Sequence, residues 1–532
     1  MAKKIIAVLL VLAMVFSLAA CGTPANNNTN GGGNQNNSNE APKTDKYGGV
    51  YRVITTAKCT GLFPLTANLS NTFTDPCYES LIWIDNLDNS ITKVLCTDYT
   101  PSADGKEVTV KIRQGVKFHD GSDLNADVVV WNYELANKNR ILSKSHNPTC
   151  EKVDDYTVKI IFDKMYLDYE NALTLKIASK KHYDDVGEEK YMYDPCGTGP
   201  FKFKENGYVA DTSVAFVKWE GYWGKSADGD QLPYLDGYEI LSINDDNAMM
   251  TALVNGDGDC MKMGTKSVID QLKASGYTDK RILGADAFIL YGIAAFDGHD
   301  ASIPWSNIKV REAVFKYGID YEKVMKLGEP DLGILDHNLG AEAALVYDKS
   351  INSEYTYDAA KCKELLKEAG YENGFDSTIY CISIATDIAT AIQSNLKDVG
   401  INLKVETVGS ADQRRKDGST PGLFMLTLPS YYDNVSNTMA STFDPDGTGY
   451  CKNMIFLDNY KAKKLAAQGA QTNEERAKLG VEALKALLLE DYTATVVCHV
   501  FTPVFESMDV HDSHCGNFQM TPATIWREVK NK

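Results

Sequence analysis

The stretch AIQSNLKDVGINLKV, from Ala391 to Val405, predicts a helix that is followed directly by a strand. Apolar residues recur at helical spacing up to Val399. Gly400 then favours a helix end, because glycine adopts the left-handed backbone conformation without steric cost. After this glycine, apolar and polar residues alternate up to Val405, which is typical of a half-buried strand. A helix, a glycine and a strand in this order indicate an α/β domain.

The same pattern recurs through the second half of the chain. The segment 309–318 carries apolar residues at positions i, i+3, i+4 and i+7, which form one face of a helix. Asp358 is placed to cap a helix that ends at Gly370. The segment 479–489 predicts another strong helix, and 494–501 predicts a buried strand. We therefore expect an α/β architecture for this half.

The first half begins with strands and turns. The sequence GGVYRVIT after residue 47 predicts a buried strand, and alternation from Val108 to Ile112 predicts a half-buried one. Asn125 is placed to cap a helix. The stretch DPCGTGPFKF, 194–203, is glycine-rich but lacks the G-x-G-x-x-G spacing and a following Lys-Ser/Thr pair. It predicts a tight turn into a strand and not a phosphate-binding loop.

The chain opens with a secretory signal peptide, which we place at residues 1–20. Lys3 and Lys4 precede an apolar run from Ile5 to Ala20, which is shorter than the roughly 20 apolar residues of a membrane span. The four residues LAAC, 18–21, resemble a bacterial lipobox. That resemblance implies cleavage before Cys21 and lipidation of its thiol, the alternative being an ordinary signal that happens to end at a cysteine.

Residues 21–46 are predicted to form a lipid-anchored, disordered linker. This segment is rich in Asn, Gly and Thr and has hardly any apolar side chain, so it cannot bury enough surface to offset its loss of entropy on ordering. Asn-rich tracts are also typical of prion-like segments, but this one has no aromatic residue before Tyr47. We interpret it as a tether that holds a globular body near a membrane on the extracytoplasmic face.

Size, charge and cysteine content limit the class of protein. The 532 residues exceed one ordinary core, so two or more lobes are expected. Loss of the leader removes Lys3 and Lys4 and no acidic residue, which changes the net charge from −18 to −20. Such acidity argues against nucleic acid as a partner. The eleven cysteines after Cys21 include no C-x-x-C pair and are expected to be mostly small buried residues.

Several stretches together resemble the family 5 solute-binding proteins of ABC importers, which include dipeptide- and oligopeptide-binding lipoproteins. The resemblance runs from about Gly48 to the C-terminus, and no single motif decides it. The stretches are IRQGVKFHDGSDLNADVV (112–129), GTGPFKF (197–203), YWG and LPYLDGYEI (222–240), ALVNGDGD (252–259), VREAVFKYGID (310–320), KELLKEAGYENGF (363–375) and IQSNLKDVGINLKV (392–405).

This resemblance implies an α/β, two-lobed periplasmic-binding-protein type II fold with an enlarged first lobe, the lobes joined by a hinge. Lobe 1 is expected at 47–288, completed by 492–532, and lobe 2 at 289–491. The implied role is that of a monomeric receptor, not an enzyme, without cofactor or metal. It would capture a peptide by lobe closure and deliver it to a permease driven by a separate ATPase. An oligosaccharide, a nickel complex or another small solute is the alternative cargo.

The resemblance also suggests ligand-binding residues. In peptide-binding relatives an aspartate after a lobe 2 strand takes the peptide ammonium, and Asp433 falls at that place. Pro429-Ser430 stands where relatives have Gly-Trp, and Tyr431 and Tyr432 are candidates to restore an aromatic wall; a helix cap is the other interpretation of Asp433. The lobe 1 candidates to pair with ligand backbone are Thr56, Lys58 and Cys59, the alternative being an ordinary loop.

Other candidates are weaker. His499 lies near the expected return to lobe 1, where relatives often place an aromatic contact, and a core histidine is the alternative. DPDGTGY, 444–450, has calcium-loop spacing but Ile455 at the position of the bidentate glutamate, so a turn is the better interpretation. HDSHC, 511–515, offers a transition-metal cluster without a further ligand nearby. No nucleophile elbow or H-E-x-x-H motif indicates an exported enzyme.

Overall fold

The structure is a computed structural model, and the chain after residue 44 forms one compact unit. It describes residues 46–66, 71–85, 90–139, 141–142, 148–163, 165–166, 169–262, 266–281, 286–293, 302–328, 332–340, 342, 344–408, 421–429, 443, 458–500, 503–513 and 522–528. The predicted signal peptide, Cys21 and nearly all of the predicted linker lie outside these residues. In the part of the chain that is described, no helix is long and apolar enough to cross a membrane.

A seven-stranded mixed sheet organises the first lobe, in the order β12-β19-β11-β1-β10-β9-β8. Its strands are β1 (Val50–Thr55), β8 (Phe201–Val209), β9 (Ser213–Lys218), β10 (Gly237–Ser242), β11 (Cys260–Lys262), β12 (Asp279–Arg281) and β19 (Pro503–Glu506). The strands predicted from GGVYRVIT and from Phe201 onward are confirmed as β1 and β8. Because β1 pairs parallel with both β10 and β11, these three strands end at the same edge of the sheet.

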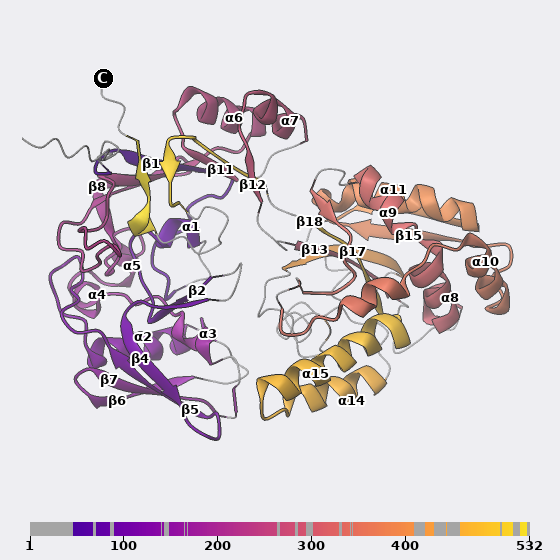
Figure 1. Cartoon of the computed structure of the whole chain (residues 1–532), viewed down its shortest axis with the longest axis horizontal. Helices are drawn as coiled ribbons and strands as arrows, with labels where there is room; N and C mark the ends of the chain where they lie inside the picture. The colour runs from indigo at the N-terminus through magenta and orange to yellow at the C-terminus, as the bar shows by residue number, and fades with distance from the viewer. Residues whose placement is uncertain are drawn as a thin grey trace, which may run out of the picture. The chain divides into compact units, whose positions relative to one another are not determined.

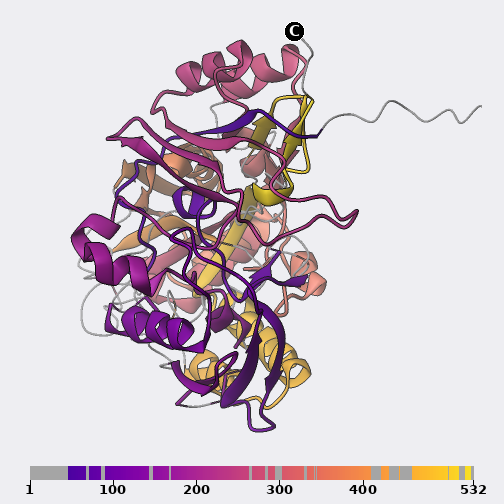
Figure 2. The ribbon, with the colours of Figure 1, turned by 90° about the vertical axis from the view of Figure 1, so that its left-hand side faces the viewer.

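Helices cover one face of this sheet and a large apolar core covers the other. On one face, Ile54 and Met261 pack against apolar side chains of α6 (Asp246–Asn255) and α7 (Lys266–Ala274). Figure 2 shows these two helices together above the strands. On the other face, Tyr51 and Val53 belong to a core that continues into the rest of the first lobe. Successive side chains of β1 thus point to opposite faces of the sheet and pack into two different cores.

The rest of the first lobe is a second layer of strands and helices built around that continuing core. A four-stranded antiparallel sheet has the order β4-β5-β7-β6. The predicted half-buried strand is confirmed as β5, and the predicted cap is confirmed because Asn125 accepts a hydrogen bond from the Val128 amide at 3.1 Å. The elements are α1 (Asn71–Thr74), β2 (Ile82–Ile84), β3 (Ile91–Lys93), β4 (Cys96–Pro101), β5 (Glu107–Ile112), α2 (Ala126–Lys138), β6 (Thr149–Asp154), β7 (Thr157–Ile161), α3 (Glu170–Leu173), α4 (Lys180–Val186) and α5 (Glu188–Tyr191).

A six-stranded mixed sheet organises the second lobe, in the order β14-β18-β13-β17-β15-β16. Its strands are β13 (Asp286–Ile293), β14 (Gly333–Ile334), β15 (Phe375–Cys381), β16 (Ile401–Thr407), β17 (Gly422–Pro429) and β18 (Ala494–Val500). The prediction for 391–405 is confirmed: α11 (Thr386–Leu396) continues as a short 3₁₀ turn, Gly400 has a φ of +87°, and β16 starts at the next residue.

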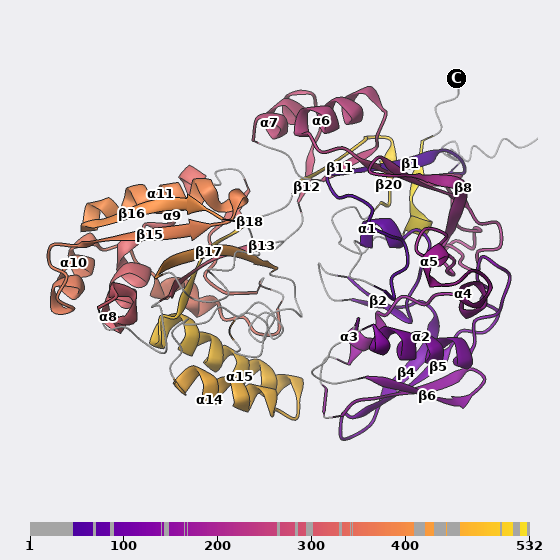
Figure 3. The ribbon, with the colours of Figure 1, turned by 180° about the vertical axis from the view of Figure 1, so that it is seen from behind.

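Helices cover both faces of the second sheet. One face packs against α8 (Ile308–Glu312), α9 (Tyr321–Gly328), α10 (Ala359–Glu368) and α11, and the other against α15 (Asn473–Lys485), which pairs with α14 (Asp458–Gln468). Figures 1 and 3 show α9 and α11 on one side of the strands and α14 and α15 on the other. Asp358 caps α10 as predicted. The helix predicted over 309–318 starts one residue earlier, and its second half, from Ala313, is a π-helix.

The chain passes between the two sheets twice, and these passages define the lobes. The first lies between β12 and β13, and the second between β18 and β19. The expected lobe 2 limits of 289 and 491 would cut β13 and leave β18 outside the sheet to which it belongs. We therefore propose 286 and 500 as the limits of lobe 2, with 503–528 completing lobe 1.

Candidate functional site

The lobe 1 candidates and, along the sequence, Asp433 follow the carboxyl ends of β1 and β17, each of which has a parallel neighbour. In open α/β sheets, ligands bind beyond that edge. In the first sheet, β1, β8, β10 and β11 all end there, since β9 is antiparallel to both β8 and β10. Contacts between the loops confirm this arrangement, because the Ser242 hydroxyl donates to the Ala57 carbonyl at 2.9 Å and Lys58 Nζ lies 3.4 Å from Asp211 Oδ1.

Both passages between the lobes leave from this edge. In the first sheet, β19 is antiparallel to β11 and β12, so β12 ends and β19 begins at the edge where β1 ends. In the second sheet, Asp286 pairs with Pro429 and with Val500, so β17 ends where β13 begins and β18 ends. Val500 and Pro503 are three residues apart, which limits their Cα separation to about 11 Å. Chain connectivity thus ties the carboxyl end of β1 to that of β17.

The three lobe 1 candidates differ in how they lie. Thr56 and Lys58 are exposed, and the exposed ion pair of Lys58 with Asp211 leaves the ammonium open to solvent. Cys59 points inward: it is 7% exposed, its thiol donates to the Gly61 carbonyl at 3.5 Å, and burial raises its pKa. Thr56 and Lys58 therefore have side chains available to a ligand, whereas the Cys59 side chain lies in the core and its carbonyl accepts from Tyr208 Oη at 3.4 Å.

The lobe 2 candidates are only partly within the described residues. Asp433, Tyr431 and Tyr432 lie outside them, and the description of the strand before them, β17, ends at Pro429. His499 lies on β18, is 3% exposed, and its Nε2 is 2.7 Å from the Asn338 carbonyl oxygen. A ligand contact by these four residues remains a prediction.

A partly buried carboxylate that sequence reasoning missed joins several of the family-like stretches. Glu79 accepts hydrogen bonds from Thr198 Oγ1 at 2.9 Å, Tyr222 Oη at 2.7 Å and Trp223 Nε1 at 2.9 Å. Desolvation outweighs these bonds and raises the pKa of the Glu79 carboxyl to about 7. A single acid inside the apolar run CYESLIWI is the signal that could have identified it. Its partners are held within the first lobe, so we assign it a structural role.

The glycines of GTGPF serve close backbone packing, as the predicted turn requires. The Gly199 amide donates to the Cys77 carbonyl at 2.9 Å. A Cβ at Gly197 would lie 2.2 Å from the Cys77 carbonyl oxygen, so only glycine fits. His119 seals the same turn, because its Nε2 lies 2.9 Å from the Gly199 carbonyl oxygen and its backbone amide donates to the Gly197 carbonyl. Nothing in this turn is arranged to hold a phosphate.

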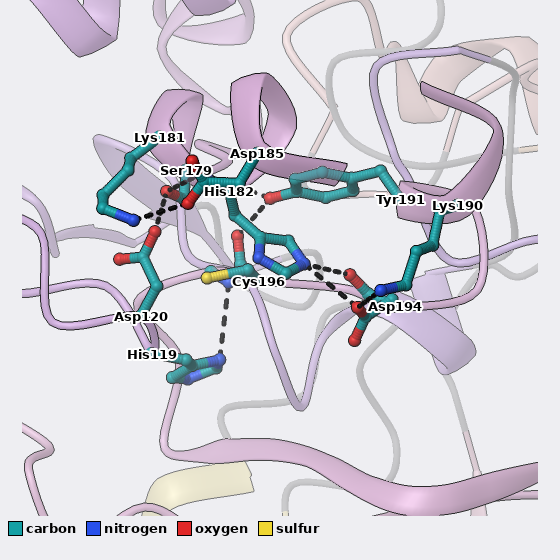
Figure 4. Close-up of polar contacts among 11 residues, drawn as sticks. His119, Asp120, Ser179, Lys181, His182, Asp185, Lys190, Tyr191, Asp194 and Cys196 are labelled. Atoms are coloured by element: carbon teal, nitrogen blue, oxygen red, sulfur yellow. Dashed lines mark hydrogen bonds and ion pairs between the residues drawn. The ribbon is translucent and has the colours of Figure 1, made fainter. Parts of the chain in front are cut away.

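Polar side chains beside this turn form a network that fixes α4 and α5, shown in Figure 4. Asp120 accepts from the Ser179 hydroxyl at 2.7 Å, and the Ser179 amide donates to Tyr191 Oη at 3.1 Å. His182 Nε2 lies 3.0 Å from the Asp194 carbonyl oxygen and 3.4 Å from its carboxylate. Among the described residues, no group of three or more His, Cys, Asp and Glu could hold a metal ion. His514, Cys515 and the predicted calcium-like turn at 444–450 lie outside those residues.

Comparisons with known proteins agree with this architecture. The family model for bacterial extracellular solute-binding proteins, family 5 (middle), matches residues 90–450. The glutathione-binding protein GsiB of Pectobacterium atrosepticum is 32% identical over 406 residues, 73% of this chain and 74% of that protein. HbpA2 from Haemophilus parasuis has a TM-score of 0.76 at 22% identity, covering 90% of this chain and 100% of that chain. DppA from Helicobacter pylori in complex with the peptide STSA has a TM-score of 0.70 at 21% identity, covering 91% and 99%.

Proposed function

We propose a receptor function on one premise: the chain belongs to family 5 of the bacterial extracellular solute-binding proteins. It has the two-lobed periplasmic-binding-protein type II fold that the sequence predicts, with an enlarged first lobe. It is a solute-binding protein of the ABC-transporter class and not an enzyme.

Within this family, we propose that the protein captures a short peptide by lobe closure and delivers it to a permease. The observation that supports this most directly is the chain connectivity between the lobes. It joins the edge of the first sheet where β1 ends, just before Thr56 and Lys58, to the edge of the second sheet where β17 ends, from which the chain runs on to Asp433. The backbone of Thr56 and Lys58 lies beyond the last paired residue of β1, and extended backbone of this kind can pair with an extended ligand. Because a relative is named for glutathione binding, that tripeptide is the first ligand to test.

Substitution of Asp433 by asparagine is expected to weaken peptide binding at least about tenfold. A hydrogen bond to a charged group contributes roughly 1.5–3 kcal/mol, and about 1.4 kcal/mol is a factor of ten in affinity. Calorimetric titration of glutathione and of a free dipeptide against wild type and Asp433→Asn measures the loss. N-acetylated versions of the same peptides should bind the wild type poorly and should be little affected by the substitution.

Asp184→Asn is the matched control, because Asp184 is an exposed carboxylate on α4 in the first lobe. Equal peptide affinities for Asp433→Asn and Asp184→Asn would contradict the assignment of Asp433. Binding of an uncharged oligosaccharide or of a nickel complex, with no binding of any peptide, would replace the peptide by the alternative cargo.

We also propose that Cys21 carries a lipid that holds the receptor on the extracytoplasmic face of the cell membrane. The expected result for Cys21→Ser is release of the protein from the membrane fraction into the soluble fraction, because a lipid chain contributes about 0.8 kcal/mol per buried CH₂. Fractionation followed by immunoblotting measures it, with Cys59→Ser as a cysteine control in the folded body. Retention of Cys21→Ser in the membrane fraction would contradict the lipid anchor.

A further inference from the structure

The strand that leads back to the first lobe, β18, has a defect in its pairing. On β13, Phe288 pairs with Cys498 and Ile289 pairs with Val496, which leaves Val497 as the extra residue of a β-bulge. On the other side, β14 pairs with only the last two residues of β18, His499 and Val500. A bulge disrupts the ladder locally. The middle of this buried strand therefore needs other partners on the β14 side.

Two buried histidines supply those contacts beyond the end of β14. His337 is 2% exposed, and its Nδ1 lies 2.8 Å from the Val496 carbonyl oxygen. His499 is 3% exposed, and its Nε2 lies 2.7 Å from the Asn338 carbonyl oxygen. An imidazole nitrogen that faces a carbonyl oxygen at these distances must donate, which fixes the tautomer of each ring. The two side chains thus connect β18 to the segment 335–340 in both directions.

The surroundings of these rings favour the neutral form. His337 stacks on Tyr355 with ring centroids 4.1 Å apart and lies edge-on to Tyr321 at 4.6 Å. Tyr321 Oη is itself 2.8 Å from Thr495 Oγ1 on β18. The charged group that acts on both histidines is Asp336, whose carboxylate already accepts from the Asn338 backbone and side-chain amides and from Tyr347 Oη. Among the described residues, Tyr347 contacts Asp336, and Tyr492 and Glu354 act on Tyr355.

We propose that His337 and His499 form an acid-sensitive clamp on β18, which loosens when the rings are protonated and thereby weakens the grip of the receptor on its ligand. The clamp itself is a property of the second lobe. Only its effect on ligand binding rests on the proposed receptor function. The strand it holds ends at Val500, at the edge from which the chain passes to β19, so its order is coupled to the passage between the lobes.

The direction of the pH effect follows from the two histidines. Burial lowers the pKa of His337 to about 4 from its ordinary value of 6.5, and burial also lowers the pKa of His499. An opened strand exposes rings that take up protons near pH 6.5, whereas the closed strand resists them. The clamp is therefore fully stable above about pH 6.5 and loses stability as the pH falls toward 4. For His337 alone, the opening equilibrium should rise about 20-fold between pH 7 and pH 5.

Amide hydrogen exchange tests the clamp without any ligand. Protection factors of the β18 amides, corrected for intrinsic exchange, are expected to fall about 20-fold or more in the wild type between pH 7 and pH 5. The variant His337→Asn/His499→Gln keeps a donor at the Nδ1 and Nε2 positions but cannot titrate, so its protection should stay constant over that range. His182→Asn, in the first lobe, is the control and should behave as the wild type does.

The outcomes separate the two parts of the proposal. If β18 protection in the wild type does not change between pH 7 and pH 5, or changes equally in the double variant, the clamp is wrong whatever the protein binds. If β18 loosens as expected, the affinity for the peptide found by titration at pH 7 should fall at pH 5 in the wild type and fall less in His337→Asn, which leaves the candidate ligand contact His499 in place. Equal pH dependence of affinity in both proteins would overturn the link to ligand binding. Failure to bind any peptide at pH 7 would count against the proposed cargo and leave the exchange result standing.

Discussion

Arg311→Met is expected to lower the free energy of unfolding of the second lobe by at least about 4 kcal/mol. Arg311 is 1% exposed, and its guanidinium donates to the carbonyls of Trp305 at 2.9 Å, Ser306 at 3.1 Å, Asp491 at 2.9 Å and Tyr492 at 3.1 Å. A buried polar group that loses its partner costs about 1–3 kcal/mol, and methionine would leave four such carbonyls. Burial lowers the pKa of Arg311 to about 10, so it remains charged at neutral pH.

Arg311→Lys is expected to recover only part of this loss. The guanidinium bridges two segments that are far apart in sequence, before α8 and before β18, with a planar fork of five N–H donors. A lysine ammonium has three donors on one atom and cannot reach both segments with the same geometry. Urea unfolding monitored by tryptophan fluorescence and by exchange of the β18 amides measures the change.

Lys309→Met is the matched control, two residues away on the same helix. Lys309 pairs with Glu368 at 2.7 Å on the surface, with half of its side chain exposed. Exposed ion pairs contribute about 0–1 kcal/mol. If Arg311→Met unfolds at the same urea concentration as Lys309→Met, the carbonyl clamp of Arg311 does not stabilise the lobe as we infer.

Arg311 shows why part of the fold could be predicted and part could not. The helical spacing in 309–318 depends on neighbours within one turn, and the sequence contains that pattern directly. The same spacing gives no sign that a charged residue beside Val310 is buried, or that the helix widens to a π-helix at Ala313. Those features depend on contacts with residues about 180 positions later, such as Asp491. Local periodicity therefore predicts elements better than it predicts buried polar partners.

The candidate site also has features that the sequence predicted and features that only the structure showed. The position of Thr56 and Lys58 beyond a strand end followed from the strand prediction and the resemblance, and the structure places both side chains in the open. That the two passages leave from the same edge became apparent only from strand pairing, because three-residue strands such as β11 and β12 have too little periodicity to predict. His337 lies in a segment without any pattern, so its contact with Val496 had no signal in the sequence.

Glu79 gives the second large prediction, a contribution to the stability of the first lobe that is lost as the pH rises. The pKa of its carboxyl is about 7 in the folded protein and about 4.5 when unfolded, so the folded state binds more protons between these values. Stability from this group is therefore full below about pH 4.5 and is lost as the pH rises through 7. A shift of this size corresponds to roughly 2–3 kcal/mol after allowance for the partial exposure of the residue. His119 in the same lobe, whose pKa burial lowers to about 4, has the opposite slope, so the effect of Glu79 is measured as the difference between the wild type and a Glu79 variant.

Glu79→Gln isolates this effect, because it removes the titration and keeps the shape. The amide oxygen can accept from Trp223 Nε1 and Thr198 Oγ1, and the amide nitrogen can donate to Tyr222 Oη if that hydroxyl turns. We therefore expect Glu79→Gln to fold and to gain roughly 2 kcal/mol of first-lobe stability relative to the wild type as the pH rises from 5 to 8, whereas Glu79→Ala leaves Trp223 Nε1 without an acceptor and should lose about 2 kcal/mol or more at every pH. Urea midpoints at pH 5, 6, 7 and 8, read from tryptophan fluorescence and first-lobe amide exchange, measure both.

Glu189→Gln, an exposed glutamate on α5, is the control. Parallel pH curves for wild type and Glu79→Gln would mean that the buried carboxylate is ionised at little cost, and the hydrogen bonds from Thr198, Tyr222 and Trp223 would then outweigh its desolvation.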